Sequence, residues 1–169
     1  MDLMVAIRRY HAADNNLPEA VRHLETLYHR HFKLMKPLDK LRDQLCAYAA
    51  EFTASGNTVI KAFVTMRMEL TPHLELGGEI GRVDAVGPGQ YSCWMFIRGP
   101  RDWRAELRMP LLQLYCAQEF GVPLAEVSVG VYDFSLGRHE ATAYTSSAVE
   151  EARGEAIALL SEFVPPVSP

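Results

Sequence analysis

The sequence predicts a single mixed α/β domain, in which one sheet of about five short strands has helices laid against it. The order of hydrophobic patterns carries this prediction: two helical segments, three strand-like segments, a helix, two further strands and a last helix, or ααβββαββα. The chain has 169 residues, the size of one compact domain. Its hydrophobic residues make up 49% of the total, which is enough for a sizeable core.

The first part of the chain, residues 1–57, is predicted to be helical, although residues 3–9 fit a strand as well as a helical turn. Pro18 suits the first turn of a helix, where its missing N–H is not needed, and apolar residues recur behind it every three or four positions. Ser55-Gly56-Asn57 closes the second helix. The two predicted helices span 17–35 and 38–54.

Three strand-like segments follow, rich in β-branched and apolar residues and separated by turn-forming residues. Thr71-Pro72-His73 returns the chain after the first strand, and Gly87-Pro88-Gly89-Gln90 is a strong hairpin signal after the second. Gly99-Pro100 ends the third strand. The predicted strands are 59–70, 74–86 and 91–98.

The rest of the chain alternates between helices and strands. Pro110 is expected to divide the next helical segment, whose regular half runs from Leu111 to Phe120 before Gly121-Val122-Pro123 ends it. Ser146 or Ser147 is expected to cap the final helix. The remaining predicted elements are strands near 126–134 and 139–145, and a final helix whose inward face consists of Val149, Ile157, Leu160 and Phe163.

The net charge of −4 and the pI near 5.9 argue against strong autonomous binding of nucleic acid, because that affinity comes mainly from basic side chains that neutralise phosphates. A local basic patch is still compatible with the sequence, since arginines cluster between Arg82 and Arg108. No apolar run approaches the roughly 20 residues of a membrane helix. Arg8 and Arg9 follow only a short apolar stretch, so we expect no secretory signal and a cytoplasmic protein.

The stretch from Glu69 to Tyr115 contains two motifs, Gly78-Glu79-Ile80-Gly81-Arg82-Val83-Asp84 in the second predicted strand and Leu111-Leu112-Gln113-Leu114-Tyr115 in the helix after the third. Their order resembles the PD-(D/E)XK nucleases of the RecB type, including the CRISPR-associated ones. In that family a Gly-x-x-Asp strand delivers a metal-binding carboxylate, the next strand delivers an acid and a lysine two residues apart, and a Gln-x-x-x-Tyr helix follows. The resemblance covers roughly residues 58–163 and implies a restriction-endonuclease-like sheet.

The resemblance makes Asp84 the first ligand of a divalent metal, Mg²⁺ or Mn²⁺, and Glu69 a second one. Such a metal neutralises charge on the phosphate oxygens and activates water. The alternative for Asp84 is an ion pair with Arg82 or Arg98, which the absence of the other family residues favours. The alternative for Glu69 is a cross-strand ion pair.

The third predicted strand lacks the family's acid and lysine. Residues 93–99 are Cys-Trp-Met-Phe-Ile-Arg-Gly, and the alignment places Met95 at the acid position and Ile97 at the lysine position. Neither side chain ligates magnesium or polarises water. Arg98 is one residue away, points to the other face and cannot act as a base. The following helix departs as well, with Leu111 at the position of the glutamine.

Three cysteines, Cys46, Cys93 and Cys116, are far apart in the sequence and form no Cys-x-x-Cys pair. We expect all three to be buried or half-buried thiols. They are too few for the four-cysteine iron–sulfur cluster that some RecB-type nucleases hold, so that cofactor is not expected.

The predicted function is therefore a catalytically inactive nuclease-like subunit that binds nucleic acid, partner proteins or both within a larger nucleic-acid-processing or defence complex. Inactive copies in helicase–nuclease and CRISPR-type machines hold a strand or brace a partner, and the resemblance implies the same here. No residue is assigned to catalysis, Glu69 and Asp84 are vestiges of the site, and no cofactor is expected. The side chains expected to contact DNA or RNA are Arg67, Arg82, Arg98, Arg101, Arg104 and Arg108.

Two alternatives stay open at this point. Members of this fold can supply a catalytic side chain from the neighbouring helix, so Glu69, Asp84 and Glu106 would hold Mg²⁺ or Mn²⁺ in an active nuclease with a migrated site. A pure protein-interaction module without nucleic-acid contact is the other alternative, and the acidic pI favours it.

Overall fold

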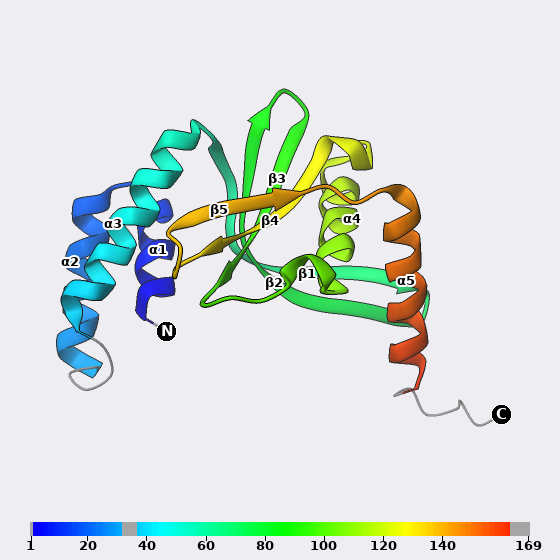
Figure 1. Ribbon diagram of the computed structural model, residues 1–169, viewed down its shortest axis with the longest axis horizontal. Coiled ribbons are helices and arrows are strands. Elements are labelled where there is room, and N and C mark those ends of the chain that lie inside the picture. The colour runs from blue at the N-terminus through cyan, green and yellow to red at the C-terminus, as the bar shows by residue number, and fades with distance from the viewer. Residues whose placement is uncertain (1, 32–36, 163–169) are drawn as a thin grey trace.

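The computed structural model describes residues 2–31 and 37–162, which form three N-terminal helices, a five-stranded sheet and two further helices (Figure 1). The predicted mixed α/β fold class is confirmed. In chain order the helices and strands are α1 (Asp2–Ala12), α2 (Leu17–His31), α3 (Leu38–Ser55), β1 (Thr58–Thr71), β2 (Leu74–Gly87), β3 (Gln90–Ile97), α4 (Arg108–Phe120), β4 (Val127–Asp133), β5 (Arg138–Thr142) and α5 (Ser146–Ser161).

The strands lie in the order β1-β2-β3-β4-β5. Pairing is antiparallel between β1 and β2, between β2 and β3, and between β4 and β5, whereas β3 and β4 run parallel. Parallel neighbours need a crossover connection, and α4 lies within it. The helices α1, α2 and α3 lie to one side of the sheet, and α4 and α5 lie to the other (Figure 1).

The two faces of the sheet carry separate cores because successive side chains of a strand point to opposite faces. On β3, Cys93 and Ile97 pack in the core under α4, whereas Phe96 packs against the core under α1–α3. Tyr132 of β4 and Phe134 of the following turn pack in the core under α1–α3. The N-terminal helices and the sheet therefore share one packed interior. A third cluster of buried hydrophobic residues packs α5 against the outer half of the β1–β2 hairpin.

The segment that the sequence left open, residues 3–9, is helical and belongs to α1. Leu3, Ile7 and Tyr10 are buried, and their spacing of four and three residues is that of one helical face. The ambiguity arose because a helix of this length is too short for its apolar spacing to stand out from a strand pattern. The predicted end of the first long helix at Met35 lies outside the described residues.

Two predictions about helix ends were wrong. Pro110 does not divide a helix but lies in the first turn of α4, where its nitrogen needs no intrahelical partner. The cap of α5 is Thr145 rather than Ser146 or Ser147: its extended backbone places the hydroxyl oxygen to accept a hydrogen bond from the Ala148 N–H at 3.2 Å.

The predicted burial of the remaining features agrees with the structure in most places. Cys93 and Cys116 are buried and Cys46 is half-buried, as expected. Val149 is buried on the inner face of α5, whereas Phe163 lies outside the described residues.

Within the described residues, no helix combines the length and the apolar character needed to cross a membrane.

Gly130, in the middle of β4, lies where β5 and the Trp94 ring approach most closely. A methyl group added there would come within 2.2 Å of the Glu140 carbonyl oxygen, 2.7 Å of the Trp94 ring and 2.9 Å of Ala141 Cα. Two of these neighbours are backbone atoms that the β4–β5 ladder holds in place. Only glycine therefore fits at this position.

We predict that Gly130→Ala lowers the free energy of unfolding by about 2 kcal/mol or more, because the strand beside it must move to admit the methyl group. Urea denaturation followed by tryptophan fluorescence measures this loss. Gly77→Ala in β2 is the matched control, because the nearest atom to its added methyl group is a carbonyl oxygen at 4.0 Å. Equal losses in the two variants would contradict the prediction.

Candidate functional site

Asp84 lies in β2 near its end, as predicted, but its side chain is buried and paired rather than open to a cleft. Arg82 Nε is 2.8 Å from Asp84 Oδ1, and both side chains are 0% exposed. Residues two apart on a strand share a face, and this face is the one that the N-terminal helices cover. The structure thus shows the ion pair of Asp84 with Arg82 that was the alternative to a metal ligand.

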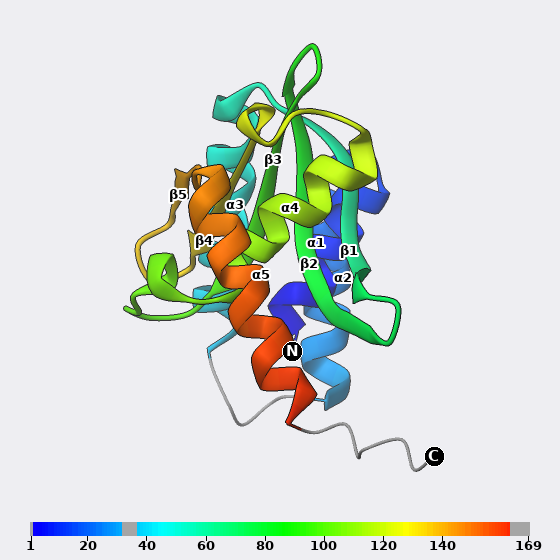
Figure 2. The ribbon, with the colours of Figure 1, turned by 90° about the vertical axis from the view of Figure 1, so that its right-hand side faces the viewer.

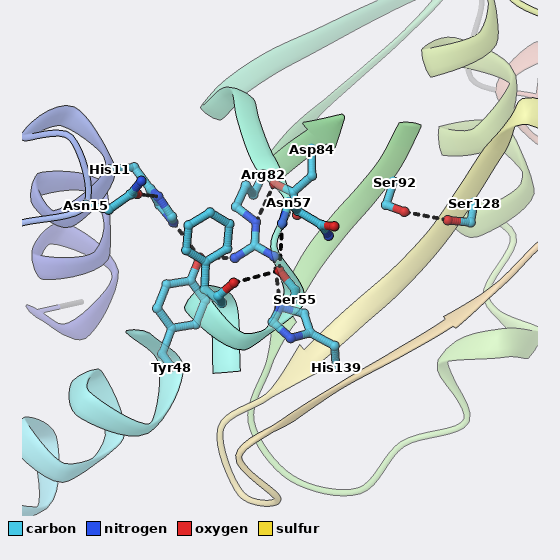
Figure 3. Close-up of polar contacts among 11 residues, drawn as sticks. His11, Asn15, Tyr48, Ser55, Asn57, Arg82, Asp84, Ser92, Ser128 and His139 are labelled. Carbon is cyan, nitrogen blue, oxygen red and sulfur yellow. Dashed lines mark hydrogen bonds and ion pairs between the residues drawn. The ribbon is translucent and has the colours of Figure 1, made fainter. Parts of the chain in front are cut away.

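Arg82 lies at the centre of a hydrogen-bond network that extends into α3 and α1 (Figure 3). Its Nη1 donates to the hydroxyl of Tyr48, and that hydroxyl lies 2.6 Å from His11 Nε2. His11 Nδ1 lies 2.8 Å from Asn15 Oδ1 in the turn after α1. The guanidinium also lies over the rings of Tyr48 and Phe52, with Cζ at 5.4 Å and 4.6 Å from their centroids. Arg82 therefore ties the first and third helices to the sheet.

The other arm of the network reaches β5. Arg82 Nη2 lies 2.9 Å from His139 Nε2, and His139 Nδ1 lies 3.6 Å from Glu51 Oε1 on α3. Trp94 packs edge-on against the His139 ring, with the centroids 4.6 Å apart. The network consequently joins β2, β3, β5 and α3 around one buried guanidinium.

Arg82 fixes the direction of the hydrogen bonds that it makes itself, because a guanidinium donates and never accepts. His139 Nε2 must therefore accept, which places the ring proton on Nδ1, facing Glu51. Tyr48 accepts from Arg82, which leaves its hydroxyl proton to donate to His11 Nε2, and the neutral His11 ring then donates from Nδ1 to Asn15 Oδ1. Both imidazoles must be neutral for this arrangement to hold.

The surroundings of the network shift the pKa values of its members. Burial, with a smaller contribution from the charge of Arg82, lowers the pKa of His11 and of His139 to about 4. Burial also raises the pKa of Tyr48, and it raises the pKa of Asp84 although Arg82 opposes that shift. At neutral pH the two histidines are therefore uncharged, as the hydrogen-bond directions require.

Two hollows flank the network and share Asn57. One, of about 310 Å³, lies between the end of α3 and strands β2, β3 and β5, and Glu51, Trp94 and His139 are among its walls. The other, of about 680 Å³, lies between α1 and the start of β1 and has Arg8 and Lys61 at its rim. Of the network groups on these walls, His11 and His139 are hydrogen-bonded within the protein, whereas Trp94 Nε1 is buried without a hydrogen-bond partner among the described residues. The arrangement therefore joins the helical layer to the sheet.

The residues beside Asp84 on the next strand are not those that the alignment named. Asp84 is directly opposite Ser92, and Arg82 is opposite Trp94. Met95 and Ile97 belong to the other face, in the core under α4, because they differ from Ser92 by an odd number of residues. That part of the alignment was wrong by one position. The conclusion drawn from it is unchanged, since Ser92, Trp94 and Phe96 include neither an acid nor a lysine.

Glu69 and Asp84 do not share a site. Glu69 is exposed and lies opposite Glu75 near the hairpin turn, whereas Asp84 lies opposite Val59 at the other end of β1. Ten residues of strand separate the two places, which is roughly 33 Å. Among the described residues, no three His, Cys, Asp or Glu side chains are placed to hold a metal ion.

Glu106, the third member of the migrated metal site, is engaged elsewhere. It pairs with Arg101 at 2.5 Å and with Arg108 at 2.6 Å. A site made of Glu69, Asp84 and Glu106 is therefore not assembled in this structure, and these residues do not fit a Mg²⁺ or Mn²⁺ ion.

The six arginines expected to contact nucleic acid lie in different surroundings. Arg82 cannot do so, because its side chain is buried in the ion pair with Asp84. Arg67 is exposed on the β1–β2 hairpin. The other four, together with Arg138 of β5, form what we call the arginine cluster, around the β3–α4 connection: Arg98, Arg101, Arg104, Arg108 and Arg138.

Within the arginine cluster, arginines share carboxylates. Arg101 and Arg108 both pair with Glu106, whereas Arg104 and Arg138 both pair with Glu140, at 3.3 Å and 2.7 Å. With Arg98 and the exposed Asp102 included, five arginines and three acids lie in this region, which leaves this part of the surface positive.

Sequence reasoning missed the members of the network other than Arg82 and Asp84. Tyr48 occupies a position in the apolar stripe of α3 and is indistinguishable there from a core tyrosine. His11 and His139 carry no spacing motif, and they join one network only because α1 packs on the sheet face to which His139 of β5 belongs. A buried-face parity argument applied to Arg82 would have shown that the arginine needed partners from the covering helices.

No family model matches the sequence, and no curated protein matches it significantly.

We predict that Arg82→Met lowers the free energy of unfolding by about 3–5 kcal/mol, because it leaves the Asp84 carboxylate buried without a counter-charge. Arg82→Met/Asp84→Asn removes that charge and is expected to recover part of the loss. Urea denaturation of both variants measures the difference. If the double variant is no more stable than the single one, the ion pair is not the reason for the loss.

We also predict that the protein loses stability as the pH falls from about 6.5 to about 4. In that range the histidines of the unfolded chain bind protons while His11 and His139 in the folded protein do not, which removes up to about 1.4 kcal/mol per pH unit for each histidine. Above pH 6.5 neither state is protonated and this loss disappears. Asp84 acts in the opposite sense, since its raised pKa favours proton uptake by the folded state.

His139→Gln tests this pH dependence, because a glutamine oxygen can still accept from Arg82 and does not titrate. The slope of stability against pH below 6.5 is expected to decrease in this variant, as measured by urea denaturation at successive pH values. His73→Gln, in the exposed β1–β2 turn, is the control and should keep the slope of the parent protein. An unchanged slope in His139→Gln would show that the buried imidazole does not set the acid limit.

Proposed function

We propose that this chain is a PD-(D/E)XK-like domain that no longer hydrolyses phosphodiesters and acts as a binding subunit within a larger nucleic-acid-processing or defence complex. One observation carries the proposal: Asp84, the residue that would be the first metal ligand, is buried in an ion pair with Arg82. The mixed sheet with a helical crossover between parallel strands β3 and β4 is compatible with the proposed family.

The burial of Asp84 bears directly on the chemistry. A catalytic magnesium ion keeps several waters and takes carboxylate ligands that face the substrate. Asp84 faces a guanidinium instead, so a cation at its oxygens would have to displace Arg82 from a site without solvent. Trp94 and Phe96 fill the space along β3 on the same face. These side chains stabilise the sheet–helix interface in place of a hydrolytic cleft.

Binding of a nucleic-acid strand is supported by the arginine cluster. Arg101, Arg104 and Arg138 are each about half exposed, so their guanidinium groups can exchange a carboxylate for a phosphate. Exposed ion pairs contribute little to stability, which keeps the cost of this exchange small. Arg104 also lies over the Trp103 ring at 4.3 Å, which holds its guanidinium at the surface.

A pure protein-interaction module is the second candidate, and the charge of the chain favours it. The net charge is −4, and Glu106 and Glu140 already neutralise part of the arginine cluster. The two candidates differ in their response to salt, because counterion release makes strand binding strongly salt-dependent.

We predict that labelled single-stranded DNA or RNA binds with an affinity that falls as salt rises, with a logarithmic slope of about −0.7 per phosphate contacted. Arg101→Glu/Arg104→Glu should weaken binding by about tenfold or more, because each substitution turns an attraction into a repulsion. Fluorescence anisotropy at two or more salt concentrations measures both effects. Arg22→Glu, an exposed arginine on α2, is the control with the same change of charge per residue.

Absence of any salt-dependent binding would contradict the nucleic-acid part of the proposal and favour the protein-interaction module. The same samples incubated with Mg²⁺ or Mn²⁺ test the loss of hydrolysis. Cleavage of the strand that disappears in Asp84→Ala would contradict the proposal, because it would mean that the buried carboxylate can still serve a metal.

A further inference from the structure

Glu106 is held between two members of the arginine cluster, one on each of its oxygens. Arg101 Nε lies 2.5 Å from Oε1, and Arg108 Nε lies 2.6 Å from Oε2. A phosphodiester likewise carries its charge on two unesterified oxygens of one phosphorus atom. Two guanidiniums that converge on one group with two anionic oxygens are therefore also arranged for a phosphate.

The same arrangement occurs a second time, at Glu140. Its Oε1 lies 2.7 Å from Arg138 Nη2, and its Oε2 lies 3.3 Å from Arg104 Nη2. Figure 2 shows that the β3–α4 connection and β5 lie on one side of the molecule, with β1 on the other. The arginine cluster thus contains two sites of one kind within one region of the surface. Such a pair of sites suits a ligand that repeats the same charge along its length.

The ion pairs of these two sites differ from the buried pair of Arg82 and Asp84 in their contact with solvent. The four arginine side chains are 43–60% exposed, and those of Glu106 and Glu140 are 20% and 24% exposed, whereas both members of the buried pair are 0% exposed. Exposed ion pairs contribute little to stability, so another anion can replace one partner at small cost. The carboxylates of the arginine cluster are therefore exchangeable, and that of Asp84 is not.

Bases find no free ring to stack on in this region. Trp103 is 3% exposed, and the Arg104 guanidinium lies over its ring at 4.3 Å. Tyr144 is half-buried, and its hydroxyl donates to the Arg104 carbonyl oxygen at 2.8 Å. Throughout the described residues, every phenylalanine, tyrosine and tryptophan is likewise buried or half-buried. Because single strands are usually held by stacking of their bases on exposed rings, we expect a strand here to be held by its phosphates instead.

We propose that each arginine pair binds one backbone phosphate of a nucleic-acid strand, and that Glu106 and Glu140 occupy these two sites in the free protein. This inference rests on the proposed function, and it adds where the phosphates bind and what competes with them. Each carboxylate holds its two arginines together in the absence of a strand and opposes the phosphate that replaces it. Removing the charge of either acid therefore strengthens binding.

Glu106→Gln and Glu140→Gln test the two sites, because glutamine has nearly the shape of glutamate and no charge. Each variant should bind a labelled oligothymidylate about three- to fivefold more tightly than the parent protein at low salt, since a competing ion pair is lost. Fluorescence anisotropy measures the dissociation constants. A labelled phosphodiester chain of the same length without bases should show the same gain, because the bases contribute no contact.

Two matched controls remove one acidic charge each. Asp102→Asn removes an exposed acid of the same region that no arginine holds among the described residues, so the gain should stay below about twofold. Glu25→Gln removes an acid that pairs with the single arginine Arg42, between α2 and α3, and should leave the affinity of the parent protein unchanged. Circular dichroism and thermal unfolding establish that each variant folds.

Three results would overturn the inference while the proposed function stands. The first is a parent protein that binds the strand and glutamine variants that bind it no more tightly. The second is an equal gain in Asp102→Asn, which would mean that the total charge of the region matters and not the paired sites. The third is a gain that disappears when the probe lacks bases. If neither the parent protein nor any variant binds either probe, the nucleic-acid part of the proposed function fails, and the inference fails with it.

Discussion

The buried guanidinium of Arg82 is the constraint on which the rest of the structure depends. A group that stays charged at every accessible pH must find a counter-charge and acceptors inside the protein. Asp84 supplies the charge, and Tyr48 and His139 supply the acceptors. These partners come from β2, α3 and β5, so the arginine determines how the helical layer sits on the sheet. It also explains why α1 and α3 belong to the domain, since His11 and Tyr48 complete the network.

The same constraint decides the chemistry available at Asp84. A carboxylate serves a catalytic metal when it is free to trade water for the ion, whereas one committed to a buried arginine is already neutralised. The two histidines are held neutral by the donors that face them, so neither can act as an acid at neutral pH. The most polar region of the core is therefore the least reactive one. The proposed binding of a strand therefore rests on the surface, where the arginine cluster lies.

The elements could be predicted from the sequence because each repeats a local pattern: the turns at Thr71-Pro72-His73 and Gly87-Pro88-Gly89-Gln90 fixed two hairpins, and the helical spacing fixed α3. What could not be predicted depends on which face a residue occupies. Met95 and Ile97 were placed beside Asp84, yet one position of register puts them on the opposite face. The meeting of His11, Tyr48 and His139 depends on packing between distant elements, which no local pattern encodes.

The two edges of the sheet differ in length and in charge. β5 is short, with five residues, and it carries Arg138 of the arginine cluster, which pairs with Glu140 on the same strand. Because the cluster holds more arginines than acids, the rest of the surface is more negative than the net charge of −4 suggests. If the chain binds nucleic acid as proposed, this asymmetry steers the strand to the side of the arginine cluster. The long edge of β1 carries exposed Arg67 and Glu69 in its outer half instead, so its charges are balanced.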